Sequence, residues 1–336
     1  MRHRLKDVAE RAGVSVKTVS NVVNGYLHVR PDTRARVEEA IAELNYRPNL
    51  SARNLRKGRT GAIALAVPEL DIPYFAELAR HVVTVAAEHG WTVLIHQTEG
   101  GPEQERKAAA GIGDHMIDGL IFSPLALTAD DLSGLDGTPM VLLGERVDHG
   151  PADHVVVDNV AAAREITAHL IGLGRRRIAA IGSQRTSEGA SARLRLAGYT
   201  AALAEAGIEY DEALVAPAPA WHRADGAAAM RELLSSGVRP DAVFCFNDTL
   251  ALGALRALHE AGLRVPEDVA VAGFDDIEDG RFSVPTLTTV APDKERIARL
   301  AVELLAGRID GDRAAPPTEL TAPYRLALRE SSTGHR

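Results

Sequence analysis

Most of the chain, from Gly61 onward, alternates short apolar runs with longer segments of helical periodicity. The apolar runs have the length of buried strands, and we predict strands at residues 62–67, 92–96, 119–123, 140–143, 155–157, 178–181, 242–246 and 269–273. Amphipathic segments that predict helices lie between most of them, at residues 73–89, 161–173, 191–206, 224–235 and 249–261. Repeated strand–helix units predict parallel sheets covered by helices on both faces. The pattern is too long for one sheet, so we expect an α/β body of two doubly wound parallel-sheet lobes.

The first residues follow a different pattern, which predicts a small all-α domain. Residues 5–25 divide at Gly13 into two short helices, and Ser15 can cap the second helix by accepting backbone N–H groups. A third helix is expected from Pro31 to Leu44, ended by Asn45 in the left-handed conformation. The expected core residues are apolar and recur at helical spacing: Val8, Ala9, Ala12, Val14, Val19, Val22, Val23, Val37, Ala40, Ile41 and Leu44. Two short helices joined at a glycine turn indicate a helix-turn-helix, whose second helix enters a DNA major groove.

Charge is divided unevenly between the two parts of the chain. Residues 1–60 hold 13 Lys and Arg against 6 Asp and Glu, a net charge of +7, which leaves −15 for the rest of the formal −8. A basic head on an acidic body suits a chain that holds phosphates at one end only. The basic segment Asn49–Arg56 is too short for a stable isolated helix in water, so it is expected to fold only with support from DNA and a partner segment.

Several other classes of protein are disfavoured. Cys245 is the only cysteine, so no disulfide framework or thiolate metal site is expected. No glycine-rich nucleotide loop or serine-hydrolase elbow is present, and we expect neither an enzyme nor a cofactor. Asp148-His149 with Asp153-His154 is the nearest approach to a metal cluster, and a solvated loop explains it better. No apolar run approaches the length of a membrane span, and the basic N-terminus is not followed by the apolar region of a secretion signal, so a cytoplasmic protein without membrane contact is expected.

A set of ordered motifs in the first 55 residues resembles the lactose-repressor (LacI/GalR) family of bacterial transcription regulators. These motifs are Lys6-Asp7-Val8-Ala9, Ala12-Gly13-Val14-Ser15, Thr18-Val19-Ser20, Asn24-Gly25, Thr33-Arg34, Tyr46-Arg47-Pro48-Asn49, Ala52-Arg53 and Leu55. The resemblance covers nearly the whole chain and implies a helix-turn-helix domain at 1–47, a hinge helix and linker at 48–60, and an effector-binding and dimerisation body at 61–336. The body resembles the periplasmic sugar-binding proteins, with an N-lobe of about 61–158 and 292–320 and a C-lobe of about 159–291 and 321–330.

Two positions in the head and the end of the chain depart from the family pattern. Arg4 and Arg30 stand where Thr or Ser usually caps a helix, and each lost cap costs about 1 kcal/mol. The short polar tail after Leu328 carries no heptads, so a homodimer rather than a tetramer is expected.

The resemblance also assigns DNA contacts. On the second helix, Val16, Lys17 and Asn21 can read thymine methyl, guanine and adenine edges. Residues that better suit phosphate contacts are Ser15, Thr18, Ser20, Asn24 and Arg34. The resemblance implies that paired hinge helices lie in the minor groove of a pseudo-palindromic operator and that a leucine kinks the duplex; the hinge contacts are Asn49, Ala52, Arg53 and Leu55. The alternatives are a flexible tether whose leucine packs on the body, and an Asn21 without a partner.

A second set of residues is implied to bind a small effector between the lobes. It consists of Asp71, Tyr74, Asp158, Ser191, Arg195, Trp221, Asn247 and Asp275. Asn247 and Asp275 follow predicted strands at their carboxyl ends, where α/β sheets bind ligands. A guanidinium fork, a carboxylate, an amide and an aromatic face suit a pyranose, although Arg195 and Asp275 could instead form a surface ion pair and Trp221 could anchor a loop.

We therefore predict a DNA-binding transcriptional repressor whose operator affinity is controlled by a small carbohydrate. The alternatives are a repressor that uses a purine or nucleoside corepressor, and a sugar-binding protein without a role in gene regulation. The complete DNA-binding head argues against the second alternative.

Overall fold

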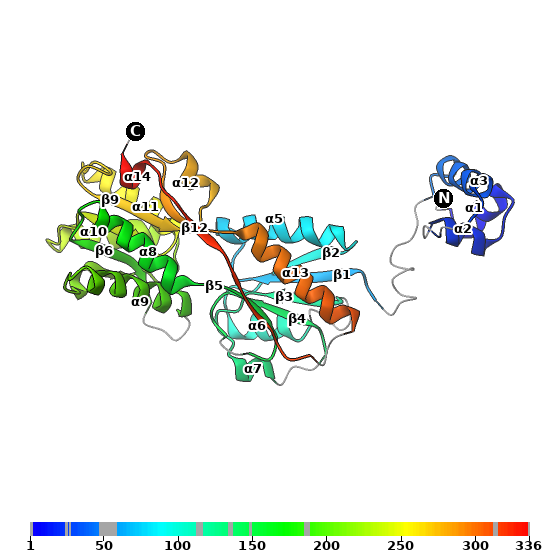
Figure 1. The fold of residues 1–336 in the computed structure, drawn as a ribbon, viewed down its shortest axis with the longest axis horizontal. Helices are drawn as coiled ribbons and strands as arrows, with labels where there is room; N and C mark the ends of the chain where they lie inside the picture. The colour runs from blue at the N-terminus through cyan, green and yellow to red at the C-terminus, as the bar shows by residue number, and fades with distance from the viewer. Residues whose placement is uncertain are drawn as a thin grey trace. The chain divides into compact units, whose positions relative to one another are not determined.

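The computed structural model describes residues 3–23, 26, 28–46, 59–111, 117–133, 137–147, 150–184, 189–311 and 315–334. The chain divides into two compact units, Met1–Gly61 and Ala62–Arg336, each with its own core (Figure 1). Within the described ranges, no helix is both long and apolar enough to cross a membrane.

The described part of the first unit contains three helices, α1 (Leu5–Ala12), α2 (Val16–Val23) and α3 (Pro31–Glu43). The turn between α1 and α2 depends on Gly13, which has a φ of 65°. The Thr18 N–H donates to the Ser15 hydroxyl at 3.1 Å, which confirms Ser15 as the cap of α2. Asn45 has a φ of 44°, the left-handed conformation predicted at the end of α3.

All eleven apolar positions predicted for this unit belong to its core or pack directly on it. Tyr46 is also buried there, although it lies beyond α3, where helical periodicity gives no signal. Neither Arg4 nor Arg30 caps its helix with a side chain, as expected. An ion pair of 2.6 Å between Arg11 and Glu43 links α1 to α3.

The second unit is built on two six-stranded sheets. The first sheet, in spatial order, consists of β11 (Glu319–Ala322), β5 (Asp153–Val157), β4 (Met140–Leu143), β3 (Gly119–Phe122), β1 (Ala62–Val67) and β2 (Thr92–Gln97). The second consists of β12 (Tyr324–Ala327), β10 (Thr288–Pro292), β9 (Ala270–Phe274), β8 (Ala242–Cys245), β6 (Ile178–Ser183) and β7 (Val215–Pro217). Only the β10–β12 pairing is antiparallel among the described strands. We call the parts around these sheets the N-lobe and the C-lobe, and they confirm the predicted fold class.

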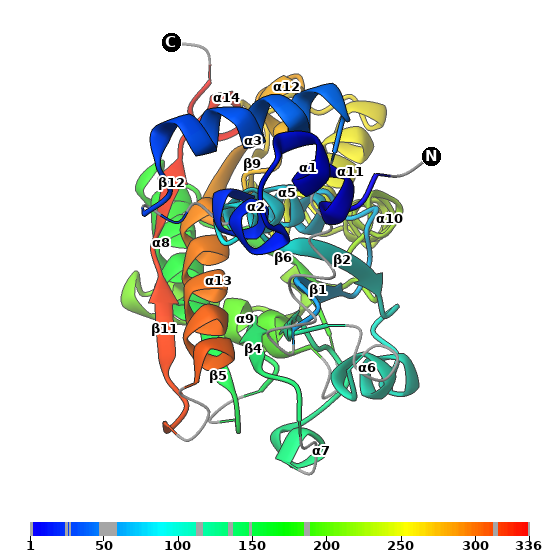
Figure 2. The same ribbon diagram turned by 90° about the vertical axis from the view of Figure 1, so that its right-hand side faces the viewer.

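Alternate residues of β1 show how the N-lobe sheet is covered on both faces. Ile63 and Leu65 pack with α5 (Pro73–Glu88) and α13 (Lys294–Asp310), while Ala64 and Ala66 face the side of α6 (Pro102–Ala109) and α7 (Ala129–Ser133). Figure 2 shows α13 running beside the edge strand β11. The side chains of β1 from Ile63 to Val67 are thus buried on one face of the sheet or the other, which explains the continuous apolar sequence of β1.

Two tightly packed helix pairs cover the C-lobe sheet: α8 (Asn159–Gly172) with α9 (Ala190–Glu205), and α10 (Arg223–Ser235) with α11 (Asp248–Glu260). A Cβ atom on Gly198 would lie 2.3 Å from the Val160 carbonyl oxygen, and one on Gly226 would lie 2.2 Å from that of Leu250. The helices approach so closely that only glycine fits at these two contacts. The short elements η1 (Glu212–Leu214), α12 (Glu278–Phe282) and α14 (Glu330–Thr333) complete the lobe.

The chain passes between the two sheets three times. It leaves the N-lobe between β5 and α8, returns between β10 and α13, and leaves again between β11 and β12. Since these passages also place the carboxyl ends of both sets of strands opposite each other, they position the site described next.

Candidate functional site

A cleft of about 640 Å³ lies between the lobes. Its walls come from loops that follow β1, β2, β3 and β4 in the N-lobe and β6, β7, β8 and β9 in the C-lobe, together with the starts of α5 and α9. Ligand sites in α/β proteins form at this edge of a sheet, and the volume is in the usual range for a small molecule.

Arg195, in the first half of α9, projects a buried guanidinium into the cleft. Its Nε donates to Asn159 Oδ1 at 2.7 Å, and its Nη1 donates to the Phe246 carbonyl oxygen. The guanidinium carbon lies 3.5 Å from the ring centroid of Phe274 and 5.3 Å from that of Trp221. Burial lowers the pKa of this guanidinium, and the Asp275 and Glu145 carboxylates oppose the shift. Within the described part of the chain, Nη2 has no hydrogen-bond partner, so a fixed charge with available donors faces the cleft.

Asp275 follows β9 and is only 7% exposed. No described residue donates a hydrogen bond to its carboxylate, whereas Lys294 Nζ donates to its main-chain oxygen at 2.5 Å. Burial raises the pKa of Asp275 to about 6, although Arg195 and Lys294 act in the opposite direction. Its φ of 116° is a conformation that L residues rarely adopt. An unpartnered buried carboxylate on a strained main chain is characteristic of a functional position.

Trp221 and Asn247 line the cleft as a connected pair. The Trp221 indole N–H donates to the Gly182 oxygen at 2.9 Å, which fixes the ring although its main chain has a φ of 57°. Asn247 Oδ1 accepts the Leu250 N–H at 2.8 Å as the cap of α11, and Nδ2 donates to the Trp221 oxygen at 3.1 Å. The amide of Asn247 is therefore occupied in holding Trp221 in place.

The remaining predicted effector residues separate into two groups. Tyr74 and Ser191 line the cleft, and burial raises the pKa of the Tyr74 hydroxyl. The structure does not bring Asp71 and Asp158 to it. Asp158 is exposed and caps α8 by accepting the Ala161 N–H at 2.9 Å, while Asp71 is exposed beside Glu69 and His222. Helix capping thus explains the Asp158 position without a ligand.

Glu145 and Phe274 are cleft residues that the sequence reasoning missed. Glu145 follows the apolar run of β4, just as Asn247 and Asp275 follow theirs, so the same signal was available. Phe274 is the last residue of β9, and its role under the Arg195 guanidinium depends on packing between two separate elements.

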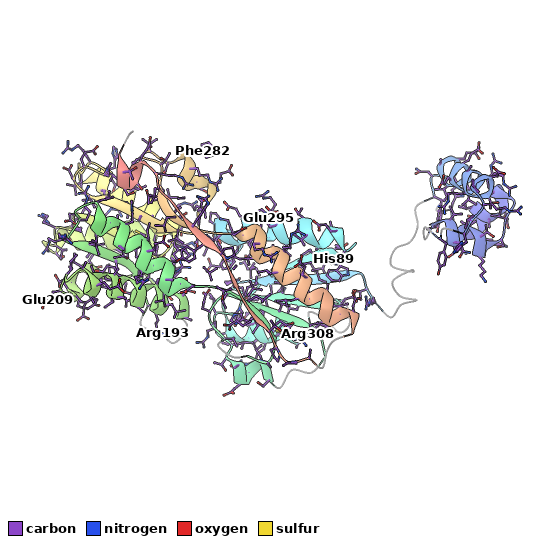
Figure 3. The ribbon with its side chains drawn as sticks, in the orientation of Figure 1. His89, Arg193, Glu209, Phe282, Glu295 and Arg308 are labelled. Atoms are coloured by element: carbon purple, nitrogen blue, oxygen red, sulfur yellow. The ribbon has the colours of Figure 1, made fainter. Side chains whose placement is uncertain are left out.

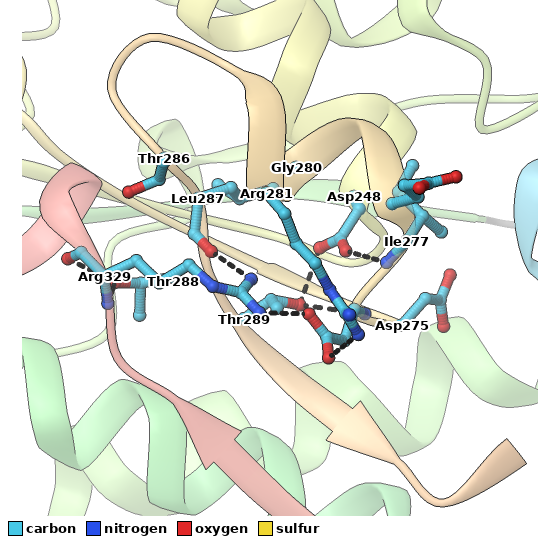
Figure 4. Close-up of polar contacts among 12 residues, drawn as sticks. Asp248, Asp275, Ile277, Gly280, Arg281, Thr286, Leu287, Thr288, Thr289 and Arg329 are labelled. Atoms are coloured by element: carbon cyan, nitrogen blue, oxygen red, sulfur yellow. Dashed lines mark hydrogen bonds and ion pairs between the residues drawn. The ribbon is translucent and has the colours of Figure 1, made fainter.

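Behind the cleft, a polar network holds the loop that carries Asp275 (Figure 4). The buried Asp248 accepts from Thr289 Oγ1 at 2.6 Å and from the Ile277 N–H at 3.0 Å, and burial raises its pKa. Burial also acts to raise the pKa of Asp276, but hydrogen bonds from Arg329 and Arg281 outweigh it and lower that pKa. These contacts fix Asp276 and Ile277, which follow Asp275, and the Asp275 carboxylate is left facing the cleft.

In the first unit, α2 presents the predicted DNA-reading side chains to different degrees. Val16 and Lys17 are exposed, whereas Asn21 is half-buried, as is the predicted phosphate contact Ser20. Among the predicted phosphate contacts, Ser15 and Thr18 hydroxyl oxygens lie 2.9 Å apart, and Arg34 Nη2 donates to the Tyr26 oxygen at 2.7 Å. The predicted contacts that lie outside the described residues are Asn24, Asn49, Ala52, Arg53 and Leu55.

Comparisons with known proteins agree with this two-part construction. Residues 4–49 match the family described as "Bacterial regulatory proteins, lacI family", and residues 167–332 match "Periplasmic binding protein-like domain". The HTH-type transcriptional regulator CelR of Thermobifida fusca is 39% identical over 98% of each chain. The HTH-type transcriptional repressor PurR of Haemophilus influenzae (strain PittEE) is 37% identical over 91% of this chain and 90% of that one.

Solved structures extend the similarity to three dimensions. A complex of the regulator CelR with cellobiose is 35% identical with a TM-score of 0.73, over 98% of this chain and 100% of that one. The lac repressor dimer bound to operator and the anti-inducer ONPF is 30% identical with a TM-score of 0.83, over 99% of both chains. The helix-turn-helix head, the two-lobed body and these full-length relatives together show that the chain is a transcription regulator belonging to the lacI family of bacterial regulatory proteins.

Proposed function

We propose that the chain represses transcription as a homodimer on a pseudo-palindromic operator, and that a small carbohydrate in the interlobe cleft controls its affinity for DNA. The observation that carries the effector proposal is the pair of buried groups, the Arg195 guanidinium and the Asp275 carboxylate, which face one cleft with hydrogen-bonding capacity unused within the described part. Hydroxyl groups can accept from the first and donate to the second. The aromatic face of Trp221 suits the C–H face of a sugar ring, and a relative of this chain is known in complex with cellobiose.

Contacts between the lobes offer a route from effector to DNA. The Ser191 hydroxyl of the C-lobe donates to Glu145 of the N-lobe at 2.8 Å. Elsewhere, the Glu278 N–H donates to Glu77 Oε1 at 2.8 Å across the same boundary. A ligand that binds more tightly to one conformation of the two lobes than to another shifts the population toward the first conformation. The resulting change in operator affinity can be no larger than this difference in ligand affinity.

The C-lobe also presents a surface suited to dimer formation. Phe282, at the end of α12, is 78% exposed (Figure 3), and Val284 is 93% exposed. Large apolar side chains gathered on an exposed loop are characteristic of protein interfaces. The lac repressor to which this chain is similar is a dimer. Because operator DNA is the partner, we place the protein in the cytoplasm and assign it no catalytic role.

A ligand screen of the full-length chain tests this function. Its melting temperature is measured with sugars, nucleobases and nucleosides, since a saturating ligand raises the melting point by mass action. Operator affinity is then measured with and without each stabilising compound. We expect a neutral sugar to stabilise the body and to change operator affinity. A nucleobase that does both would show that the effector is of the purine type and is not a carbohydrate. Equal affinity for every DNA sequence tested would contradict the proposal of a sequence-specific repressor.

A further inference from the structure

We infer that Glu145 makes the cleft selective for uncharged, hydroxyl-rich ligands and against their phosphorylated or carboxylated counterparts. The inference rests on the proposed carbohydrate effector and adds the chemical class of sugar that the site accepts.

The position of Glu145 is fixed from both lobes. It lies in the N-lobe loop after β4, half-buried at the cleft wall. One carboxylate oxygen accepts the Ser191 hydroxyl at 2.8 Å, and the other accepts the Val157 N–H at 3.3 Å. Both donors are neutral, and no described cation forms an ion pair with Glu145. Its negative charge therefore remains uncompensated by direct contact.

The groups around Glu145 make the inner cleft electronegative. Arg195 lines the inner cleft and is shared between two carboxylates, Asp275 from the C-lobe and Glu145 from the N-lobe, both of which act on it electrostatically. Lys294 also acts on Asp275, but its charge is balanced by an ion pair of 2.7 Å with Glu77. Along the whole described lining, carboxylates outnumber guanidinium groups four to two. The second guanidinium, that of Arg146, donates to the main-chain oxygen of Ala126. An anionic ligand would thus meet a surplus of like charge in a partly desolvated site.

Hydrogen-bond chemistry leads to the same selectivity. A sugar hydroxyl can donate to Glu145 or Asp275 and accept from Arg195 Nη2, so a neutral sugar can satisfy all three side chains. A phosphate or carboxylate group offers only acceptors at neutral pH, and it would face at least one carboxylate without an intervening proton. Arg195 alone could pair with it, at the expense of the two carboxylates that the guanidinium now balances.

Calorimetric titration of the full-length chain with matched ligand pairs tests the inference. The pairs are glucose with glucose 6-phosphate, trehalose with trehalose 6-phosphate, and cellobiose with cellobionic acid. At neutral pH we expect every pair that binds to show at least about tenfold tighter binding of the neutral member, given the strength of like-charge repulsion in such a site. An equal or tighter affinity for the charged member of a pair would overturn the inference and leave a carbohydrate effector standing. Binding of no sugar from the pairs or from the wider screen would overturn the proposed function, and this inference with it.

A matched pair of variants attributes the selectivity to its source. Glu145→Gln keeps the size of the side chain and can still accept a hydrogen bond from Ser191. We expect it to reduce the ratio of the affinities for the neutral and the charged ligand by at least about tenfold. Glu103→Gln, on α6 and ion-paired with Lys107 outside the cleft, is the control and should retain the wild-type difference. Far-UV circular dichroism spectra and melting temperatures like those of wild type show that both variants fold. If the affinity ratio of Glu145→Gln equals that of wild type, Glu145 is not the source of the selectivity.

Discussion

The burial of Asp275 gives the replacement Asp275→Asn a predictable effect on stability. The pKa of Asp275 in the folded chain is about 6, whereas its ordinary value is 3.8. Because the folded pKa is the higher one, the contribution of Asp275 to the free energy of unfolding is fully present below about pH 4 and is lost as pH rises through about 6. At about 1.36 kcal/mol per pKa unit, the ionised carboxylate lowers stability by about 3 kcal/mol at pH 8.

Asparagine removes this loss, because it has nearly the same size, tolerates positive φ and carries no charge. We therefore expect the stability of Asp275→Asn, relative to wild type, to rise by up to about 3 kcal/mol between pH 4 and pH 8. The comparison of variant with wild type at each pH cancels the contributions of titrating groups that Asp275 does not affect. The Asp275 carboxylate raises the pKa of the buried Asp248, so the titration of Asp248 changes in the same direction and adds to the difference.

Urea denaturation followed by tryptophan fluorescence measures this difference. Both tryptophans, Trp91 and Trp221, lie in the body, so the signal reports the unfolding of the unit that contains the site. A relative stability that does not change between pH 4 and pH 8, or that falls as pH rises, would show that the carboxylate is solvated or already paired. The same variant should bind the effector more weakly, because the carboxylate that lowers the stability of the folded chain is the group that binds the ligand.

Three further predictions concern DNA binding and assembly. Asn21→Ala should weaken operator binding by about 1 to 3 kcal/mol and relax the preference at one base pair per half-site, as measured by binding to single-base operator variants; equal losses on operator and random duplexes would mean that Asn21 does not read bases. Leu55→Ala should reduce DNA bending and specific affinity together in a gel-shift assay, because an apolar wedge between base steps is lost, and should leave effector binding intact; normal bending would contradict a wedge. Phe282→Asp should shift the chain from dimer to monomer in analytical ultracentrifugation, since a charge would be buried at the interface, with the exposed Glu209→Lys as the control; an unchanged dimer would place the interface elsewhere.

How well the fold could be predicted depended on how local the signal was. The buried β1, β3 and β4 were predicted within one residue at each end because both faces of these strands are covered and their sequences are continuously apolar. The edge strands β11 and β12 are short and partly polar, and their pairing depends on the last passage between the lobes, so no local pattern indicates them. The helix α13 was missed although Ile297, Ala301, Val302 and Leu305 recur at helical spacing, so this signal was present in the sequence.

The site shows the same limit. That Asn247 and Asp275 lie at one edge of a sheet follows from their positions after predicted strands, and Glu145 could have been found in the same way. The stacking of Arg195 on Phe274 joins a helix to a strand nearly 80 positions away, so only the folded chain reveals it. That Asp71 and Asp158 do not line the cleft is likewise a result of tertiary geometry, since their residue types fit a sugar site equally well.

The measurement that tests the effector site most directly is a calorimetric titration of the best neutral sugar into wild type, Arg195→Ala, Arg195→Lys and Asp275→Ala. Operator affinity is measured for the same four proteins with and without that sugar. We expect all three variants to bind operator like wild type, to lose most of their affinity for the sugar, and to lose its effect on DNA binding; the lysine variant fails because one ammonium cannot replace the planar guanidinium on the Phe274 ring. Wild-type sugar affinity in either alanine variant would contradict the account, because the ligand would then bind without the buried groups that define the cleft.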